Sequence, residues 1–264
     1  MSSLNVEEDT IWAQGTELVL EEYYDGEEFD IDILLSSGDI VYAKVSDNWS
    51  CMEPWFQELG ANCPSLYPQK RQDELIKLSV DTTLALGFRS GCFHVECKYT
   101  SRGPRMIEVN ARMGGVSVRD LNLIAWGVDL VEEHAMASLG IPIRPFIAQK
   151  PLKFCAETCI NCPYSGTMTE DGWLDFAKDD PEVVKIYYYK KKGDKVTGPE
   201  ESVPDWLAEI VVVSTVSQEH AINVVRRIVE KKAQIPIQPK ESSTKRLVYF
   251  PSDKFPFRKV EENS

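Results

Sequence analysis

Oxygen-bearing side chains gather on one predicted hairpin and could hold a divalent cation. Residues 91–115 predict two short strands joined by a turn at Arg102. Side chains alternate along a strand, so Glu108 and Asn110 share one face, and pairing around the turn places Glu96 opposite Glu108. Carboxylates held that close repel each other unless a cation lies between them, and oxygen ligands suit Mg²⁺. The residues alone allow either a magnesium site or a solvated strand face.

A cation and two glycines follow this hairpin directly. Arg112 carries a planar guanidinium that can bind two phosphate oxygens at once. Gly114 and Gly115 have no side chain, so a phosphate could approach their backbone closely. These residues favour the metal site, with a phosphate beside it, over a solvated face.

The motif HVE…IEVNARMGG within residues 94–115 resembles the C-terminal signature of ATP-grasp ligases. Its continuation, residues 118–141, is similar to the carnosine synthase type of ATP-grasp amino-acid ligase. The resemblance implies that Mg²⁺ (or Mn²⁺) is held by Glu96, Glu108 and Asn110. It also implies that Arg112 binds the γ-phosphate or the acyl-phosphate as the catalytic residue, with Gly114 and Gly115 beside it. Ala111 departs from the proline that many members carry at that position.

A second motif, LVLEEYYDGEEFDIDIL, resembles the hinge strand of ATP-grasp ligases, which receives adenine. The resemblance implies that Glu21 and the backbone of Glu22 and Tyr24 bind adenine, and that Glu28 binds the ribose. On the residues alone, an acidic hairpin is the alternative. The sequence offers acids and no cation near this hinge, so we expect charge to be stabilised at the γ-phosphate and ADP to be the leaving group.

The hydrophobic pattern predicts an α+β fold: the C-terminal half of an ATP-grasp fold, an antiparallel sheet with packed helices, and then a smaller α+β subdomain. Strands are expected at 16–24, at 29–35 with Asp30 and Asp32 facing outward, and at 40–45. The remaining elements follow from periodicity and end signals. They comprise helices at 69–86, 118–127, 129–139 and 218–232, and strands at 153–160, 183–189 and 209–215.

We expect four segments along the chain. They are an N-terminal tail at 1–15, the nucleotide- and metal-binding part at 16–141, a C-terminal subdomain at 152–238, and a polar tail at 239–264. Too few residues precede position 16 for the rest of an ATP-grasp fold. We therefore expect either a part of a longer enzyme or a truncated product, and weak ATP binding by the chain alone.

The net charge and the number of cysteines indicate which partners and which cellular compartment to expect. The 264 residues carry a net charge of −13, which argues against nucleic acid or an anionic membrane as the main partner. The N-terminus lacks the pattern of a targeting peptide, and seven cysteines without a secretion signal indicate a reducing compartment, so we expect the cytoplasm. Homo-oligomerisation stays open.

The resemblance implies a ligase that joins β-alanine, or a similar amino acid, to L-histidine. The carboxylate would attack the γ-phosphate of ATP, and the amine would displace phosphate from the acyl-phosphate, giving a dipeptide, ADP and phosphate. One alternative is a truncated, non-catalytic remnant that binds nucleotide or a partner. Another is an iron–sulfur protein, because Cys155, Cys159 and Cys162 have the spacing of a radical-SAM cluster motif. On a strand, such cysteines are more often small buried hydrophobes.

Overall fold

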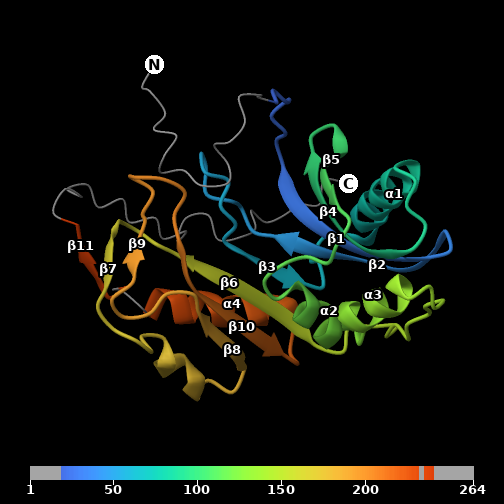
Figure 1. Ribbon diagram of the computed structural model, residues 1–264. Coiled ribbons are helices and arrows are strands. Elements are labelled where there is room, and N and C mark those ends of the chain that lie inside the picture. Colours follow the sequence, from blue (N-terminus) through green and yellow to red (C-terminus); the bar gives the residue numbers. More distant parts are fainter. Residues whose placement is uncertain (1–18, 232–234, 241–264) are drawn as a thin grey trace.

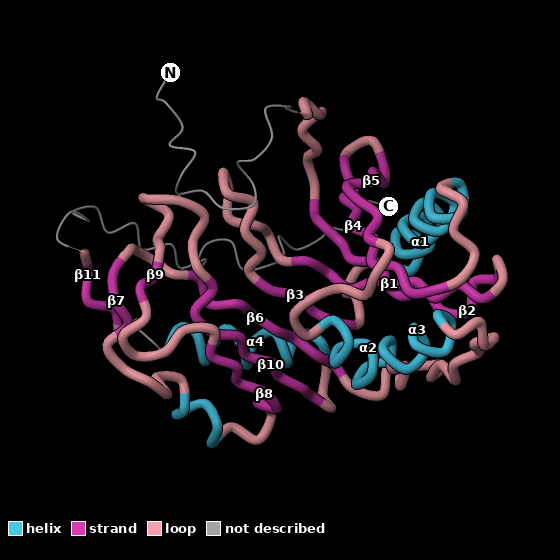
Figure 2. Tube along the Cα trace, in the orientation of Figure 1, coloured by secondary structure: helices cyan, strands magenta, loops and turns pink. Residues whose placement is uncertain are grey.

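The computed structural model describes residues 19–231 and 235–240, and its main feature is one antiparallel sheet (Figure 1). The eight strands lie in the order β5-β4-β1-β2-β3-β6-β10-β8. Figure 2 shows them as a continuous band with the helices along its sides. In chain order the strands are β1 (Glu27–Ser36), β2 (Asp39–Asn48), β3 (Gly60–Cys63), β4 (Gly91–Thr100), β5 (Gly103–Asn110), β6 (Phe154–Asn161), β8 (Val183–Tyr188) and β10 (Trp206–Ser214).

Helices cover both faces of this sheet. On one face, α1 (Gln69–Ala85) packs on β1, β2, β4 and β5, and α4 (Gln218–Lys231) packs on β6 and β10. On the other, α2 (Val118–Trp126) and α3 (Leu130–Ser138) pack over one end of the strands. Burial of apolar side chains on both faces supplies the driving force for this arrangement.

The alternation along β1 shows how the sequence selects the faces. Phe29, Ile31 and Ile33 are buried in the core beneath α1, as their spacing predicts. The outward orientation predicted for Asp30 and Asp32 is correct in parity, but the expectation that they face solvent is wrong. Asp30 is 6% and Asp32 1% exposed, because other polar side chains and α2 cover this face. Two buried acids therefore lie in the middle of the polar face.

The helix boundaries follow the end signals in the sequence. The helices expected at 69–86, 118–127, 129–139 and 218–232 form α1 to α4 within a residue or two at each end. Asp129 caps α3, since its Oδ1 accepts a hydrogen bond from the backbone N–H of Val131 at 3.0 Å. α2 ends at Gly127, whose φ of 77° is a left-handed conformation that favours glycine.

The sequence pattern did not predict several small elements of the structure. A second sheet of three strands comprises β7 (Gly166–Met168), β9 (Lys195–Val196) and β11 (Ile237–Pro239), and a short 3₁₀ helix covers Asp175–Asp179. Conversely, the strand expected at 16–24 is wrong where it can be compared, because residues 19–24 form no strand. A strand needs a neighbouring strand to pair with, and the described residues provide none there. The N-terminal tail and residues 241–264 lie outside the described residues.

The main sheet draws strands from both predicted parts of the chain. β3 pairs with β2 on one side and with β6 on the other, so it joins residues 16–141 to residues 152–238 by backbone hydrogen bonds. The division into two parts stays a prediction. Within the described residues, no helix is both long enough and apolar enough to cross a membrane.

Candidate nucleotide and metal site

The β4–β5 hairpin has the register that the sequence predicts. Glu96 is paired with Glu108, and His94 with Asn110. The Nδ2 of Asn110 donates to Oε1 of Glu108 at 2.6 Å, so the amide oxygen of Asn110 takes no part in that hydrogen bond. Burial, and next the negative charge of Glu108, raise the pKa of Glu96 to about 7. Two carboxylates in contact, with an amide oxygen beside them, fit the oxygen-rich ligand set of Mg²⁺.

A row of polar side chains extends this face onto β1. The register pairs Glu96 with Asp30 and Lys98 with Glu28, and cross-strand partners lie on the same face of a sheet. Asp30 accepts a hydrogen bond from Nδ2 of Asn48 at 2.9 Å. The metal carboxylates thus belong to a polar surface that spans several strands.

His94 contacts several acids of this surface; its parity with Glu96 on the strand allows either a contact with the nucleotide or a packed strand residue. Its Nδ1 lies 2.9 Å from Oδ1 of Asp32, and its Nε2 lies 3.8 Å from Asp30 and 3.9 Å from Glu96. Burial alone would lower the pKa of His94, but Asp30 and Asp32 raise it to about 10. The raised pKa favours the protonated, positively charged form of His94 within this acidic cluster.

The loop after β5 places Arg112, Gly114 and Gly115 in three different environments. Arg112 is exposed, and its Nη1 donates to the carbonyl oxygen of Met113 at 2.8 Å. A Cβ on Gly114 would come within 2.8 Å of the His94 ring, so close packing there requires glycine. Gly115 instead lines a pocket, where its missing side chain leaves space.

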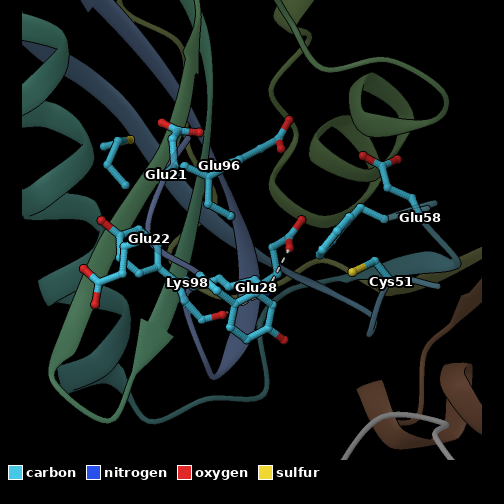
Figure 3. Close-up of a pocket in the computed structure, with 12 residues that line it drawn as sticks. Glu21, Glu22, Glu28, Cys51, Glu58, Glu96 and Lys98 are labelled. Carbon is cyan, nitrogen blue, oxygen red and sulfur yellow. Dashed lines mark hydrogen bonds and ion pairs between the residues drawn. The ribbon is translucent and has the colours of Figure 1, made fainter. Parts of the chain in front are cut away.

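A pocket of about 360 Å³ lies at the hinge and holds every residue predicted to bind adenine or ribose. We call it the hinge pocket. Figure 3 shows Glu21 and Glu22 on one side of it, Cys51 and Glu58 on the other, and Glu28 and Lys98 between them. Its lining is Glu21, Glu22, Tyr23, Tyr24, Glu28, Cys51, Phe56, Glu58, Glu96, Lys98, Met106 and Ile107.

Lys98 contradicts the expectation that no cation lies near the hinge. Its Nζ lies 3.9 Å from Oε2 of Glu28 and donates to the carbonyl oxygen of Tyr24 at 3.5 Å. Burial raises the pKa of Glu28, while Lys98 acts to lower it. The sequence analysis missed Lys98 because it lies far from the hinge along the chain. The sequence did contain one signal: Lys98 lies two residues after Glu96 on β4, so both side chains point to the same face of the sheet.

A second pocket of about 370 Å³ adjoins the first, since Glu58 and Glu96 line both. We call it the acidic pocket. Its lining is Asp30, Asn48, Glu58, Gly60, His94, Glu96, Arg112, Gly115, Val116, Val118, Glu157, Cys159 and Trp206. Arg112 and Gly115 therefore share a pocket with one metal ligand. Glu108, Asn110 and Gly114 are not among the residues that line either pocket.

The three cysteines of the iron–sulfur alternative occupy different surroundings. Cys155 is buried in the core beneath α2, while Cys159 lines the acidic pocket. Cys162 packs in the core beneath α4, where its Sγ lies 3.1 Å from the carbonyl oxygen of Tyr164, and burial raises its thiol pKa to about 12. Among residues 19–231 and 235–240, no group of three or more His, Cys, Asp or Glu side chains could hold a metal ion. The predicted metal face has two carboxylates and one amide.

Comparison with known proteins agrees with this geometry. The family model of the ATP-grasp domain matches residues 2–120. Carnosine synthase 1 of *Gallus gallus* is 38% identical over 137 residues, which cover 52% of this chain and 14% of that protein. Carnosine synthase 1 of *Homo sapiens* is 36% identical over 137 residues, covering 52% of this chain and 16% of that protein. The matched half of the chain thus covers about one seventh of the length of these relatives.

The fold agrees with solved structures as well. The L-amino acid ligase from *Bacillus licheniformis* superposes with a TM-score of 0.72 at 22% identity, covering 82% of this chain and 53% of that one. Residues 2–120 thus match the ATP-grasp domain, about half of the chain is similar to carnosine synthase, and the fold is shared with the L-amino acid ligase.

Proposed function

We propose that this chain provides the nucleotide- and metal-binding part of a carnosine synthase-like ligase, which joins β-alanine or a similar amino acid to L-histidine. The observation that carries the proposal is the place of the Glu96–Glu108 pair. Glu96 lines both the hinge pocket and the acidic pocket, so it lies where a nucleotide in one would meet an acceptor in the other, and Glu108 is paired with it across the hairpin.

The hinge pocket would receive the nucleoside. Glu21 and the backbone of Glu22 and Tyr24 would bind adenine, and Glu28 would bind the ribose hydroxyls. The ion pair between Glu28 and Lys98 supports this role for Glu28, because it holds the carboxylate at the pocket wall.

Glu96, Glu108 and Asn110 would hold Mg²⁺ or Mn²⁺. The ion, when bound, would neutralise charge on the β- and γ-phosphates of ATP. The raised pKa of Glu96 supports this role, since carboxylates that repel each other are stabilised by a cation placed between them.

Arg112 would stabilise the negative charge of the group being transferred. Its guanidinium lies free of any carboxylate ion pair that the structure records in the described residues, and it borders the same pocket as Glu96. The substrate carboxylate would attack the γ-phosphorus, ADP would leave, and the amine would then displace phosphate from the acyl carbon. We further propose that this chemistry takes place in the cytoplasm.

Product analysis tests the proposal. A complete enzyme that contains this chain is incubated with ATP, Mg²⁺, β-alanine and L-histidine, and nucleotides are separated by chromatography. We expect ADP and phosphate to form only when both amino acids are present. Release of AMP and pyrophosphate would contradict the placement of the transferred group beside Glu96 and Arg112. Nucleotide binding without any turnover would favour a non-catalytic role.

A further inference from the structure

The acidic pocket holds more negative charge than the proposed reaction uses. Its acids are Asp30, Glu58, Glu96 and Glu157, and its cations are Arg112 and His94. Glu96 is assigned to the metal and Arg112 to the phosphoryl group. His94 is hydrogen-bonded to Asp32 and lies close to Asp30. Glu157 remains without a recorded cation, so this part of the pocket suits a ligand with positive charge.

Glu157 lies on the same face of the sheet as the metal ligands. The register pairs Asn48 with Ala61 and Ala61 with Glu157, and Asn48 in turn binds Asp30. The Glu157 side chain is only 6% exposed, and its Oε2 has no hydrogen-bond partner among the described residues. Burying a carboxylate oxygen without a partner is costly, and a donor from a ligand would remove that cost.

The neighbouring Glu209 does not neutralise the charge of Glu157. It is 2% exposed and acts on Glu157 as a second buried acid. Lys185 lies 3.3 Å from Glu209, and Ser117 donates to Glu209, so those donors already serve Glu209. Burial, and next Glu209, hold the pKa of Glu157 well above its usual range.

Trp206 borders the same pocket. Its indole Nε1 is buried and has no hydrogen-bond partner in the part of the chain that the structure describes. The Tyr189 ring, 6.0 Å from it between centroids, helps to hold it in place. Trp206 is paired with Asn161, four residues from Glu157 along β6, and both Trp206 and Glu157 line the pocket. An ammonium group in the pocket would be attracted by the ring quadrupole and by the negative charge of the carboxylate.

We propose that the end of the acidic pocket formed by Glu157 and Trp206 binds the ammonium group of the amine substrate. This inference rests on the proposed function and identifies where its second substrate binds. Arg112 borders the same pocket, so the amine and the acyl-phosphate would share one continuous space. The ligand class is a primary ammonium, with L-histidine as the example used in the test.

Calorimetry with L-histidine, in the absence of nucleotide, tests the assignment. The comparison ligand is the hydroxy acid in which a hydroxyl replaces the amino group of histidine. We expect histidine to bind the unmodified chain about tenfold more tightly than the hydroxy acid, because a charge-assisted hydrogen bond is lost in the latter. In Glu157→Gln, histidine binding should weaken about tenfold, and the preference for it should disappear.

Two further variants keep the result interpretable. Glu219→Gln changes net charge by the same amount at an exposed position on α4 and should leave histidine binding unchanged. Trp206→Leu removes the aromatic face and should weaken histidine binding several-fold, which supplies a second measurement if Glu157→Gln does not fold.

Each outcome decides the inference. Equal binding of the two ligands, full affinity in Glu157→Gln, or no histidine binding at millimolar concentrations would overturn it, since all the lining residues belong to this chain. The result is separate from the proposed function, because no nucleotide is present. A preference for histidine together with AMP release in the product assay would sustain the ammonium site and contradict the proposed reaction.

Discussion

Two pairs of carboxylates on one face of the sheet differ in how their charge can be neutralised. Glu96 and Glu108 face each other across one hairpin, where Glu108 is exposed at the edge of the sheet. Glu157 and Glu209 lie on adjacent central strands and are almost fully buried. A metal ion can reach the first pair from solvent. The second pair depends on a proton, on Lys185, or on a ligand that enters the acidic pocket.

This difference shows that like-charged pairs do not all have the same function. At an open edge, repulsion between carboxylates favours a divalent cation, whose own ligands are completed by substrate phosphates. In the interior, a carboxylate usually takes up a proton instead of remaining charged. The open pair therefore fits metal binding, whereas the buried pair needs a proton, Lys185 or a cationic ligand to offset its charge.

The largest effect should come from the open pair. Glu108→Gln removes one charge with little change of shape, and we expect ligase activity to fall roughly a hundredfold, because the metal's charge neutralisation is worth several kcal/mol. ADP release as a function of Mg²⁺ concentration measures this. Activity within a few-fold of the unmodified protein would remove Glu108 from the metal ligands. Thermal unfolding serves as the folding control.

An intermediate effect should come from the buried pair and should depend on pH. The folded-state pKa of Glu157 is above its unfolded value, so its protonation stabilises the fold fully below about pH 4.5. That stability is lost as the pH rises toward the folded-state pKa. Glu157→Gln cannot ionise, so we expect it to be more stable than the unmodified chain by about 1–3 kcal/mol at pH 7 and nearly equal at pH 4.

Urea unfolding between pH 4 and 8 measures this difference. Glu219→Gln, at an exposed position, should leave the free energy of unfolding nearly unchanged throughout. If Glu157→Gln proved less stable than the unmodified chain at pH 7, the buried pair would be neutralised by something other than a proton on Glu157.

The smallest effect should come from the cation next to the buried pair. Lys185 donates to Ser117 at 2.8 Å and lies 3.3 Å from Glu209, but its side chain is 34% exposed. Solvent screens such a charge, so Lys185→Met should lower stability by only about 1 kcal/mol. Lys178→Met, on the surface, is the matched control. A loss of several kcal/mol, measured by urea unfolding, would mean that Lys185 and not a proton neutralises the pair.

The sequence by itself determined the β4–β5 hairpin and most of the regular elements. Glu96 and Glu108 are separated by one tight turn, so strand alternation was enough to pair them. The helices could also be predicted from local sequence, because capping residues such as Asp129 and Gly127 act within a single helical turn. Local periodicity and local hydrogen bonding carry this information.

Only the tertiary structure decided which distant residues share the two pockets. Lys98 meets Glu28 through the β1–β4 register, and Glu157 joins the acidic pocket because β3 brings β6 beside β2. The burial of Asp32 depends in the same way on α2, whose Asn122 donates to it at 2.7 Å. These pairings join segments tens of residues apart. No local pattern contains their register, which is selected by the fit of the whole sheet and the helices that cover it.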